Sequence, residues 1–227
     1  MRKFGSFVRV GVTGEISILR CAAHVARCCA LAAILTATGC SSRPSAVPPV
    51  KVNMDAVVSD LMAQHDTDKN GALSRSELAA SPPLEDCFSR SHRNEKDEIS
   101  ADELKSTLRR VFDPGTAVVS ATCAIRRNGQ PLAGANVKFV PLPEFKDSLP
   151  AATGVTDANG FASLAAKPEE LPSQAPKVAL MTPGFYLVEV THPTVQIPEK
   201  YNRQTVLGKE VSTETVYGGK LAIDLKL

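Results

Sequence analysis

The stretch "HDTDKNGALSRSEL" (residues 65–78) determines how the first half of the chain is interpreted. Oxygen-bearing side chains recur in it at alternate positions, and a glycine stands in their middle. Counted from Asp66 as position 1, the oxygen donors fall at positions 1, 3, 5, 7, 9 and 12: Asp66, Asp68, Asn70, the backbone carbonyl of Ala72, Ser74 and Glu77. Calcium is a hard cation that takes six to eight oxygens. The segment therefore predicts a loop that wraps around a calcium ion.

This spacing resembles the calcium-binding loop of EF-hand proteins at every ligand position, with Gly71 at the sharp bend. Ser74 and Glu77 form a capping-box pattern, which predicts that a helix begins there. An amphipathic helix is expected before the loop, because apolar residues recur at helical spacing at Met54, Val57, Val58, Leu61 and Met62. The competing interpretation is an acidic turn that happens to precede a helix.

A second, altered copy of the loop is found in "HRNEKDEISADEL" (residues 92–104). Aligning Ile99 with Leu73, the apolar residue by which paired loops contact each other in this family, repeats the capping box at Ser100 and Glu103. The ligand positions are instead occupied by His92, Asn94 and Lys96, and Asp97 replaces the glycine. A lysine ammonium has no lone pair to donate. The second loop is therefore predicted to pair with the first and to bind no calcium.

The segment "DPG" (residues 113–115) predicts a helix end and a linker. After it, the spacing of the apolar residues changes from helical to alternating. Alternating apolar residues predict strands around 119–125, 137–139, 161–164, 186–190 and 221–227, with turns at "RNGQ" and "TDANG". Residues 51–113 are thus expected to form an α-helical pair of EF-hands, and residues 116–227 an all-β sandwich of about seven strands. The expected fold class is α+β in two modules.

The second module resembles the carboxypeptidase regulatory-like, or transthyretin-like, β-sandwich domains. The resemblance rests on "NGQPLAGANVKFVP" (128–141), "GVTDANGFASL" (154–164), "PGFYLVEV" (183–190) and "IPEKYN" (197–202). It implies a domain without catalytic activity that serves as a structural or interaction module. The order of these blocks is similar to that in small lipoproteins of the bacterial cell envelope.

The N-terminal segment has the features of an export signal. Basic residues precede a short apolar run that ends in "ATGC" (residues 37–40), which resembles a bacterial lipobox with Ala37 in place of the usual leucine. We expect residues 1–39 to be removed, Cys40 to be lipidated, and the polar, proline-rich residues 40–50 to form a flexible tether. The alternative is an ordinary signal cleaved near Gly39.

Cys87 and Cys123 are then the cysteines of the folded part. One pair in an exported protein can form a disulfide, here between the two modules. Burial as free thiols is the other expectation, because free cysteine is among the residue types most often buried. The sequence does not give the distance between the two Cα atoms that a disulfide requires.

Composition excludes several functional classes. The 227-residue chain is 43% hydrophobic and 22% charged, which fits a folded protein. Residues 1–39 hold five of the 26 basic and one of the 24 acidic residues, so residues 40–227 carry a net charge of about −2, and no nucleic-acid partner is expected. The sequence contains no Gly-rich phosphate loop, His-rich metal cluster or nucleophile elbow, so no enzyme is expected.

The sequence therefore predicts a membrane-anchored envelope lipoprotein that faces the periplasm or the surface. Calcium would stabilise its EF-hand pair, and its β-sandwich would contact an envelope protein or polysaccharide. A calcium-responsive regulator of an envelope partner is one alternative. A carbohydrate-binding module is another, although the sequence has no Trp and offers only Tyr186, Tyr201 and Tyr217 for stacking on sugars.

Overall fold

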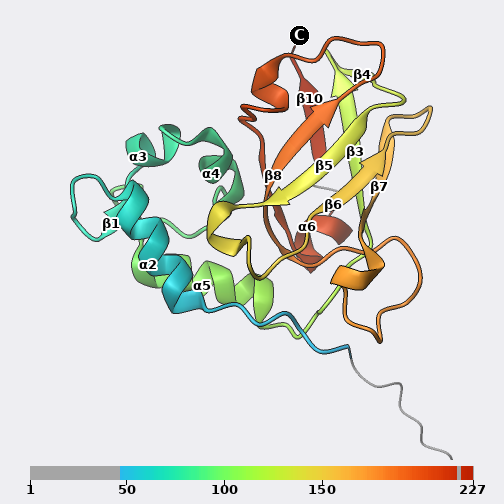
Figure 1. Ribbon diagram of the computed structural model, residues 1–227. Coiled ribbons are helices and arrows are strands. Elements are labelled where there is room, and N and C mark those ends of the chain that lie inside the picture. The colour runs from blue at the N-terminus through green and yellow to red at the C-terminus, as the bar shows by residue number, and fades with distance from the viewer. Residues whose placement is uncertain (1–46, 219–220, 227) are drawn as a thin grey trace, which may run out of the picture. The chain divides into compact units, whose positions relative to one another are not determined.

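The computed structural model describes residues 47–218 and 221–226 of the chain (Figure 1). The helices come first. They are α2 (Met54–His65), α3 (Arg75–Ala79), α4 (Pro82–Cys87) and α5 (Ala101–Phe112), with two-residue strands β1 (Ala72–Leu73) and β2 (Ile99–Ser100) between them. α3 and α5 both begin in the predicted capping boxes: the hydroxyls of Ser74 and Ser100 accept from the backbone N–H of Glu77 and Glu103. Local sequence signals thus determine where these helices start.

The two loops of the helical segment pair as expected. β1 and β2 are antiparallel, with Leu73 opposite Ile99, and both side chains are fully buried. This confirms the alignment of Ile99 with Leu73 on which the second loop was identified. α5 ends at Phe112 with Asp113 as its C-cap, as "DPG" predicted.

The strands of the second half are β3 (Ala121–Arg127), β4 (Gln130–Pro131), β5 (Asn136–Pro141), β6 (Ala152–Val155), β7 (Phe161–Ala166), β8 (Gly184–Thr191), β9 (Gly208–Val211) and β10 (Ala222–Leu225). Short helical turns connect them: η1 (Pro143–Phe145), η2 (Pro168–Glu170), η3 (Glu199–Tyr201) and α6 (Thr213–Tyr217). The alternation of apolar residues predicted neither β6 nor β9.

These strands form one strongly curled sheet (Figure 1) with the order β10-β3-β7-β6-β5-β8-β9, and β4 pairs with β3 beside this path. Neighbouring strands are antiparallel except β10 and β3, which are parallel. The expected α+β class, with helices followed by a mainly antiparallel sheet, is confirmed. The strands lie on one continuous hydrogen-bonded path, because β7 pairs with β3 on one side and with β6 on the other.

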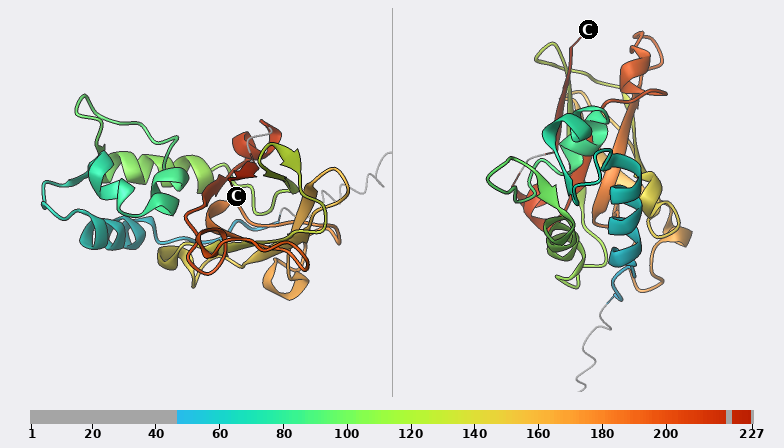
Figure 2. Two further views of the ribbon diagram at one scale, coloured as in Figure 1. Left: turned by 90° about the horizontal axis from the view of Figure 1, so that it is seen from above. Right: turned by 90° about the vertical axis from the view of Figure 1, so that its left-hand side faces the viewer.

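The helices gather on one side of the sheet (Figure 2) and share its core. Phe88 after α4 stacks on Phe185 of β8 at 4.8 Å between ring centroids, and Phe112 of α5 lies 6.2 Å from the same ring. This packing requires a glycine at position 208 of β9, because a Cβ there would lie 1.8 Å from the carbonyl oxygen of Pro83. All described residues belong to one compact unit.

Candidate metal centre

The loop between α2 and α3 folds back on its own first carboxylate. Asp66 Oδ1 accepts from the backbone N–H of Asn70 at 3.1 Å, and Oδ2 accepts from that of Gly71 at 3.0 Å. Lys69 and Gly71 have positive φ angles of 59° and 84°, which give the chain the sharp bend expected from the glycine. The predicted bend at Gly71 is therefore present.

Two further predicted ligands are oriented by short-range hydrogen bonds. Asp68 Oδ1 accepts from the N–H of Asn70 at 3.0 Å, and Asn70 Oδ1 accepts from the N–H of Ala72 at 2.8 Å. One atom from each of Asp66, Asp68 and Glu77 lies within 4.8 Å of the other two. The structure thus brings together the three carboxylates that the sequence spacing selected.

Glu77 joins the two ends of the loop. Its Oε1 accepts from the N–H and hydroxyl of Thr67 at 2.7 and 2.8 Å, and its Oε2 accepts from the N–H and hydroxyl of Ser74, both at 2.8 Å. The backbone N–H of Ser74 is the main cause that lowers the pKa of Glu77 to about 2, and burial opposes the shift. Glu77 is therefore ionised at neutral pH although it is only 9% exposed. The sequence reasoning missed Thr67, a hydroxyl residue at position 2 of the loop.

This donor set fits calcium in charge, donor type and spacing. Three carboxylates that lie this close repel one another, and a cation among them would relieve that repulsion. The oxygens of Asp66, Asp68, Asn70 and Glu77 are hard donors of the kind calcium prefers. A bound calcium would supply the charge that holds these side chains together, while the backbone N–H donors keep them oriented. Among the described residues, the group of metal-ligating side chains at this loop contains three carboxylates and no histidine or cysteine.

The second loop is closed by protein groups. Asn94 Oδ1 accepts from the N–H of Lys96 and of Glu98, both at 2.9 Å. Asp97, at the glycine position, has a φ of 64° and forms an ion pair of 2.7 Å with Arg75 from the first loop. Aspartate tolerates this left-handed conformation better than most residues do. That this loop binds no calcium stays a prediction.

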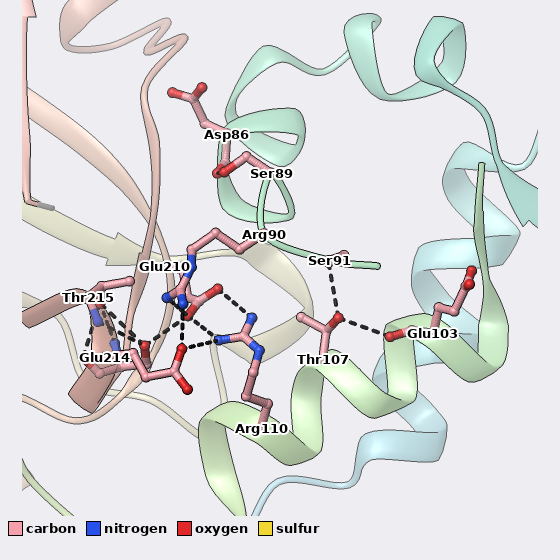
Figure 3. A network of polar contacts seen from close by, with 11 residues as sticks. Asp86, Ser89, Arg90, Ser91, Glu103, Thr107, Arg110, Glu210, Glu214 and Thr215 are labelled. Atoms are coloured by element: carbon pink, nitrogen blue, oxygen red, sulfur yellow. Dashed lines mark hydrogen bonds and ion pairs between the residues drawn. The ribbon is translucent and has the colours of Figure 1, made fainter. Parts of the chain in front are cut away.

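A charged network joins the helices to the sheet (Figure 3). Arg110 of α5 forms two hydrogen bonds of 2.7 Å with the carboxylate of Glu210 in β9, and this pair raises the pKa of Arg110. Arg90 contacts the same carboxylate at 3.1 Å and also binds Glu214 of α6. The Glu210 side chain is only 3% exposed, so its charge depends on these partners. Nothing in the sequence pattern marked Glu210 as buried.

Cys87 and Cys123 are both buried free thiols, so the disulfide considered from the sequence is not formed in this structure. Burial raises the pKa of Cys123 to about 12, and it also raises the pKa of Cys87, whose Sγ lies 3.6 Å from the carbonyl of Tyr186. Both side chains belong to the common core of helices and sheet. Packing accounts for their burial without a covalent link.

Residues 1–39, Cys40 and the first part of the tether lie outside the described residues, so the predictions on export and lipidation remain predictions. Within residues 47–218 and 221–226, no helix has the length and apolar character needed to cross a bilayer.

Comparisons with known proteins add no family assignment. No protein-family model matches the chain, and none of the curated proteins or solved structures shows significant similarity to it. The proposals below therefore rest on the residues and on the geometry they adopt.

Proposed function

We propose that the chain is a non-catalytic, calcium-binding envelope lipoprotein, anchored by lipid on Cys40, in which calcium stabilises the fold and the sheet acts as the interaction domain. The observation that carries the calcium proposal is the meeting of Asp66, Asp68 and Glu77 in a preformed loop. With three carboxylates and an exported location, the expected dissociation constant is about 10⁻⁴ to 10⁻³ M. Calcium outside the cytoplasm would then keep the site filled.

A stabilising role is favoured over a signalling role by the contacts of Glu77. This residue already bridges Thr67 at the start of the loop and Ser74 at its end, so little rearrangement is needed for it to reach an ion. Two other helices of the same segment, α4 and α5, are packed on the sheet through Phe88, which follows α4, and Phe112. A loop that is preformed and attached to a large core is suited to stabilising that core.

The proposal for the sheet follows the resemblance to carboxypeptidase regulatory-like domains. The "DANG" turn supports it: Asp157 accepts at 2.8 and 2.9 Å from the N–H of Asn159 and of Phe161, which gives a tight hairpin. Cys123 and Ile125 of β3 share one core with Val137 and Phe139 of β5, as facing parts of a sandwich would. An envelope protein or a polysaccharide is the proposed partner.

A calcium-responsive regulator is the second candidate, and one chain of contacts favours it. β1 of the calcium loop pairs with β2, α5 follows β2 directly, and Arg110 of α5 binds the buried Glu210 of the sheet. A change at the first loop could thus reach β9. Such a regulator would change shape on calcium removal and stay folded.

Calcium titration of two matched variants tests the site. Glu77→Gln removes the charge at position 12 of the first loop, and Glu103→Gln removes it at the same position of the second loop. Isothermal titration calorimetry on the chelator-treated chain is expected to show one calcium per chain. We expect Glu77→Gln to weaken binding by about tenfold or more, because affinity follows the charge of the ligands, and Glu103→Gln to leave it nearly unchanged.

The same titration distinguishes the candidate functions when near-UV dichroism is recorded beside it. Loss of the folded signal in chelator, either at once or at a lower temperature than with calcium, supports a stabilising ion. A changed spectrum in a chain that remains folded supports the regulator. Absence of any binding heat at about 10 mM calcium, well above the expected range, would refute both.

A further inference from the structure

A hollow of about 570 Å³ is lined by the end of β3 and by the segment between β8 and η3. Its lining combines one guanidinium, two uncharged polar side chains and two apolar ones: Arg127, Thr194, Gln196, Val195 and Pro198. Its volume is within the usual range for small-molecule sites. Neither the calcium loop nor the contact between helices and sheet uses this surface.

Arg127 points toward the core side of the sheet at the last position of β3. It lies opposite Leu225 of the parallel strand β10, and paired residues of neighbouring strands share a face; Leu225 is fully buried. Arg126 is the next residue along the strand and lies opposite the exposed Asp224, on the outer face. The Arg127 guanidinium forms no ion pair or hydrogen bond among the described residues. It is therefore a free cation at the rim of the hollow.

The segment that forms the other wall is held in place by side-chain hydrogen bonds. His192 Nδ1 accepts from the N–H of Thr194 at 3.1 Å and of Val195 at 3.0 Å, while Nε2 lies 2.8 Å from the carbonyl of Ala133. Because Nδ1 accepts both of these bonds, Nε2 is the nitrogen that donates to the carbonyl of Ala133. Thr194 and Gln196 are thus presented from an ordered loop that has no regular secondary structure.

Further contacts fix the rim to the end of β10. The Tyr201 hydroxyl donates to the carbonyl of Lys226 at 3.1 Å and accepts from its N–H at 3.0 Å. The Asn202 amide donates to the carbonyls of Ile197 and Pro198 at 3.1 and 3.2 Å. A wall held in this way loses little conformational freedom when a ligand binds.

The charges around the hollow favour an anion. The acidic residues of the rim are already paired, Glu199 with Arg203 and Asp224 with Lys226. Arg127 and Lys200 remain, and the Lys200 ammonium is held 4.9 Å from the centre of the Tyr201 ring. This local positive charge occurs on a chain whose residues 40–227 carry a net charge of about −2. Clefts lined by one sign of charge concentrate ligands of the opposite sign.

We propose that this hollow binds a sugar that carries an anionic group, as part of an acidic polysaccharide. Arg127 would take the carboxylate or phosphate oxygens, for which its planar guanidinium is suited. Thr194 and Gln196 would exchange hydrogen bonds with sugar hydroxyls, and Val195 and Pro198 would contact the apolar face of the ring. Recognition by charge needs no aromatic stacking residue. This proposal rests on the interaction domain proposed above, whose class of partner it names, and does not rest on the calcium site.

The test is a titration of the whole, calcium-loaded chain with trigalacturonate, which carries carboxylates, and with glucose 6-phosphate; maltotriose is the neutral control. We expect at least one anionic sugar to bind with a dissociation constant of about 1 mM or tighter and maltotriose to give no binding. Which anionic sugar binds identifies the preferred group. Arg127→Gln is expected to weaken that binding by about tenfold or more, since a charged hydrogen bond is lost.

Arg126→Gln is the matched control, because it removes the same charge one residue away on the other face of the sheet. It should leave binding of the anionic sugar nearly unchanged. An equal loss in both variants would show nonspecific attraction and overturn the proposal, as would the absence of binding by either anionic sugar. Calcium titration of the same samples keeps the two proposals apart, because a chain that binds no calcium but binds the sugar refutes only the calcium site.

Discussion

Glu210 is the residue on which the polar contact between helices and sheet depends most. Its carboxylate accepts hydrogen bonds from the guanidinium groups of Arg110 and Arg90. It also accepts one from the hydroxyl of Ser212, at 2.8 Å. Both arginine side chains are 27% exposed, whereas that of Glu210 is 3% exposed. The desolvation cost of this carboxylate is therefore offset almost entirely by its partners.

Replacing Glu210 with Gln should lower the free energy of unfolding by about 2–3 kcal/mol. The value lies below that for a fully buried pair, because the two arginines that lose their partner can still reach water. Urea denaturation measures the change, and Glu214→Gln is the control, since the Glu214 side chain is 55% exposed and surface pairs contribute about 1 kcal/mol or less. Equal effects of the two substitutions would contradict the importance given to burial.

The sequence predicted the residues of the calcium loop far better than it predicted this charged network. The ligands from Asp66 to Glu77 lie within twelve consecutive residues, so their spacing alone brings them together. Arg110 and Glu210 are 100 residues apart in the chain and meet only because α5 and β9 pack in the same unit. No local pattern records such a contact, and an isolated Glu in a strand is normally expected on the surface.

Among the described elements, α4 and β9 make the most extensive contact between helices and sheet. Gly208 permits it, because a side chain there would collide with the backbone of Pro83. Gly208→Ala should therefore lower the free energy of unfolding by about 2–3 kcal/mol, at the upper end of the usual cost of overpacking. Urea denaturation measures it, with Lys209→Ala at the neighbouring half-buried position as the control. A change as small as that of the control would mean that α4 moves aside freely.

Short sequence patterns specify some of the helices and strands, whereas others depend on contacts between distant segments. The two capping boxes, the pairing of Leu73 with Ile99 and the end of α5 followed from short patterns. The alternation in β3, β5 and β8 likewise predicted strands. β9 was missed because its buried residues include a glycine and Glu210, so it lacks apolar alternation. The parallel pairing of β10 with β3 joins segments that are about 100 residues apart, which no period in either segment encodes.

For the whole molecule, the structure changes what a calcium ion would stabilise. The sequence suggested two modules with a linker between them, and the helices instead share a core with the sheet through Phe88, Phe112 and Phe185. A ligand that binds only the folded state stabilises everything that unfolds with its site. At a calcium concentration about ten times the dissociation constant this amounts to about 1.4 kcal/mol. The sheet should therefore share this gain in stability.

Hydrogen exchange of the whole chain, with calcium and with chelator, measures whether the sheet shares this stabilisation. If the ion stabilises one cooperative unit, calcium should raise protection by a similar factor, about tenfold at ten times the dissociation constant, in α2, α5 and the central strands β5 and β8. Glu77→Gln should remove the difference, whereas Glu103→Gln should keep it. Protection that changes only within residues 66–77, while β5 and β8 exchange equally with and without calcium, would contradict the account.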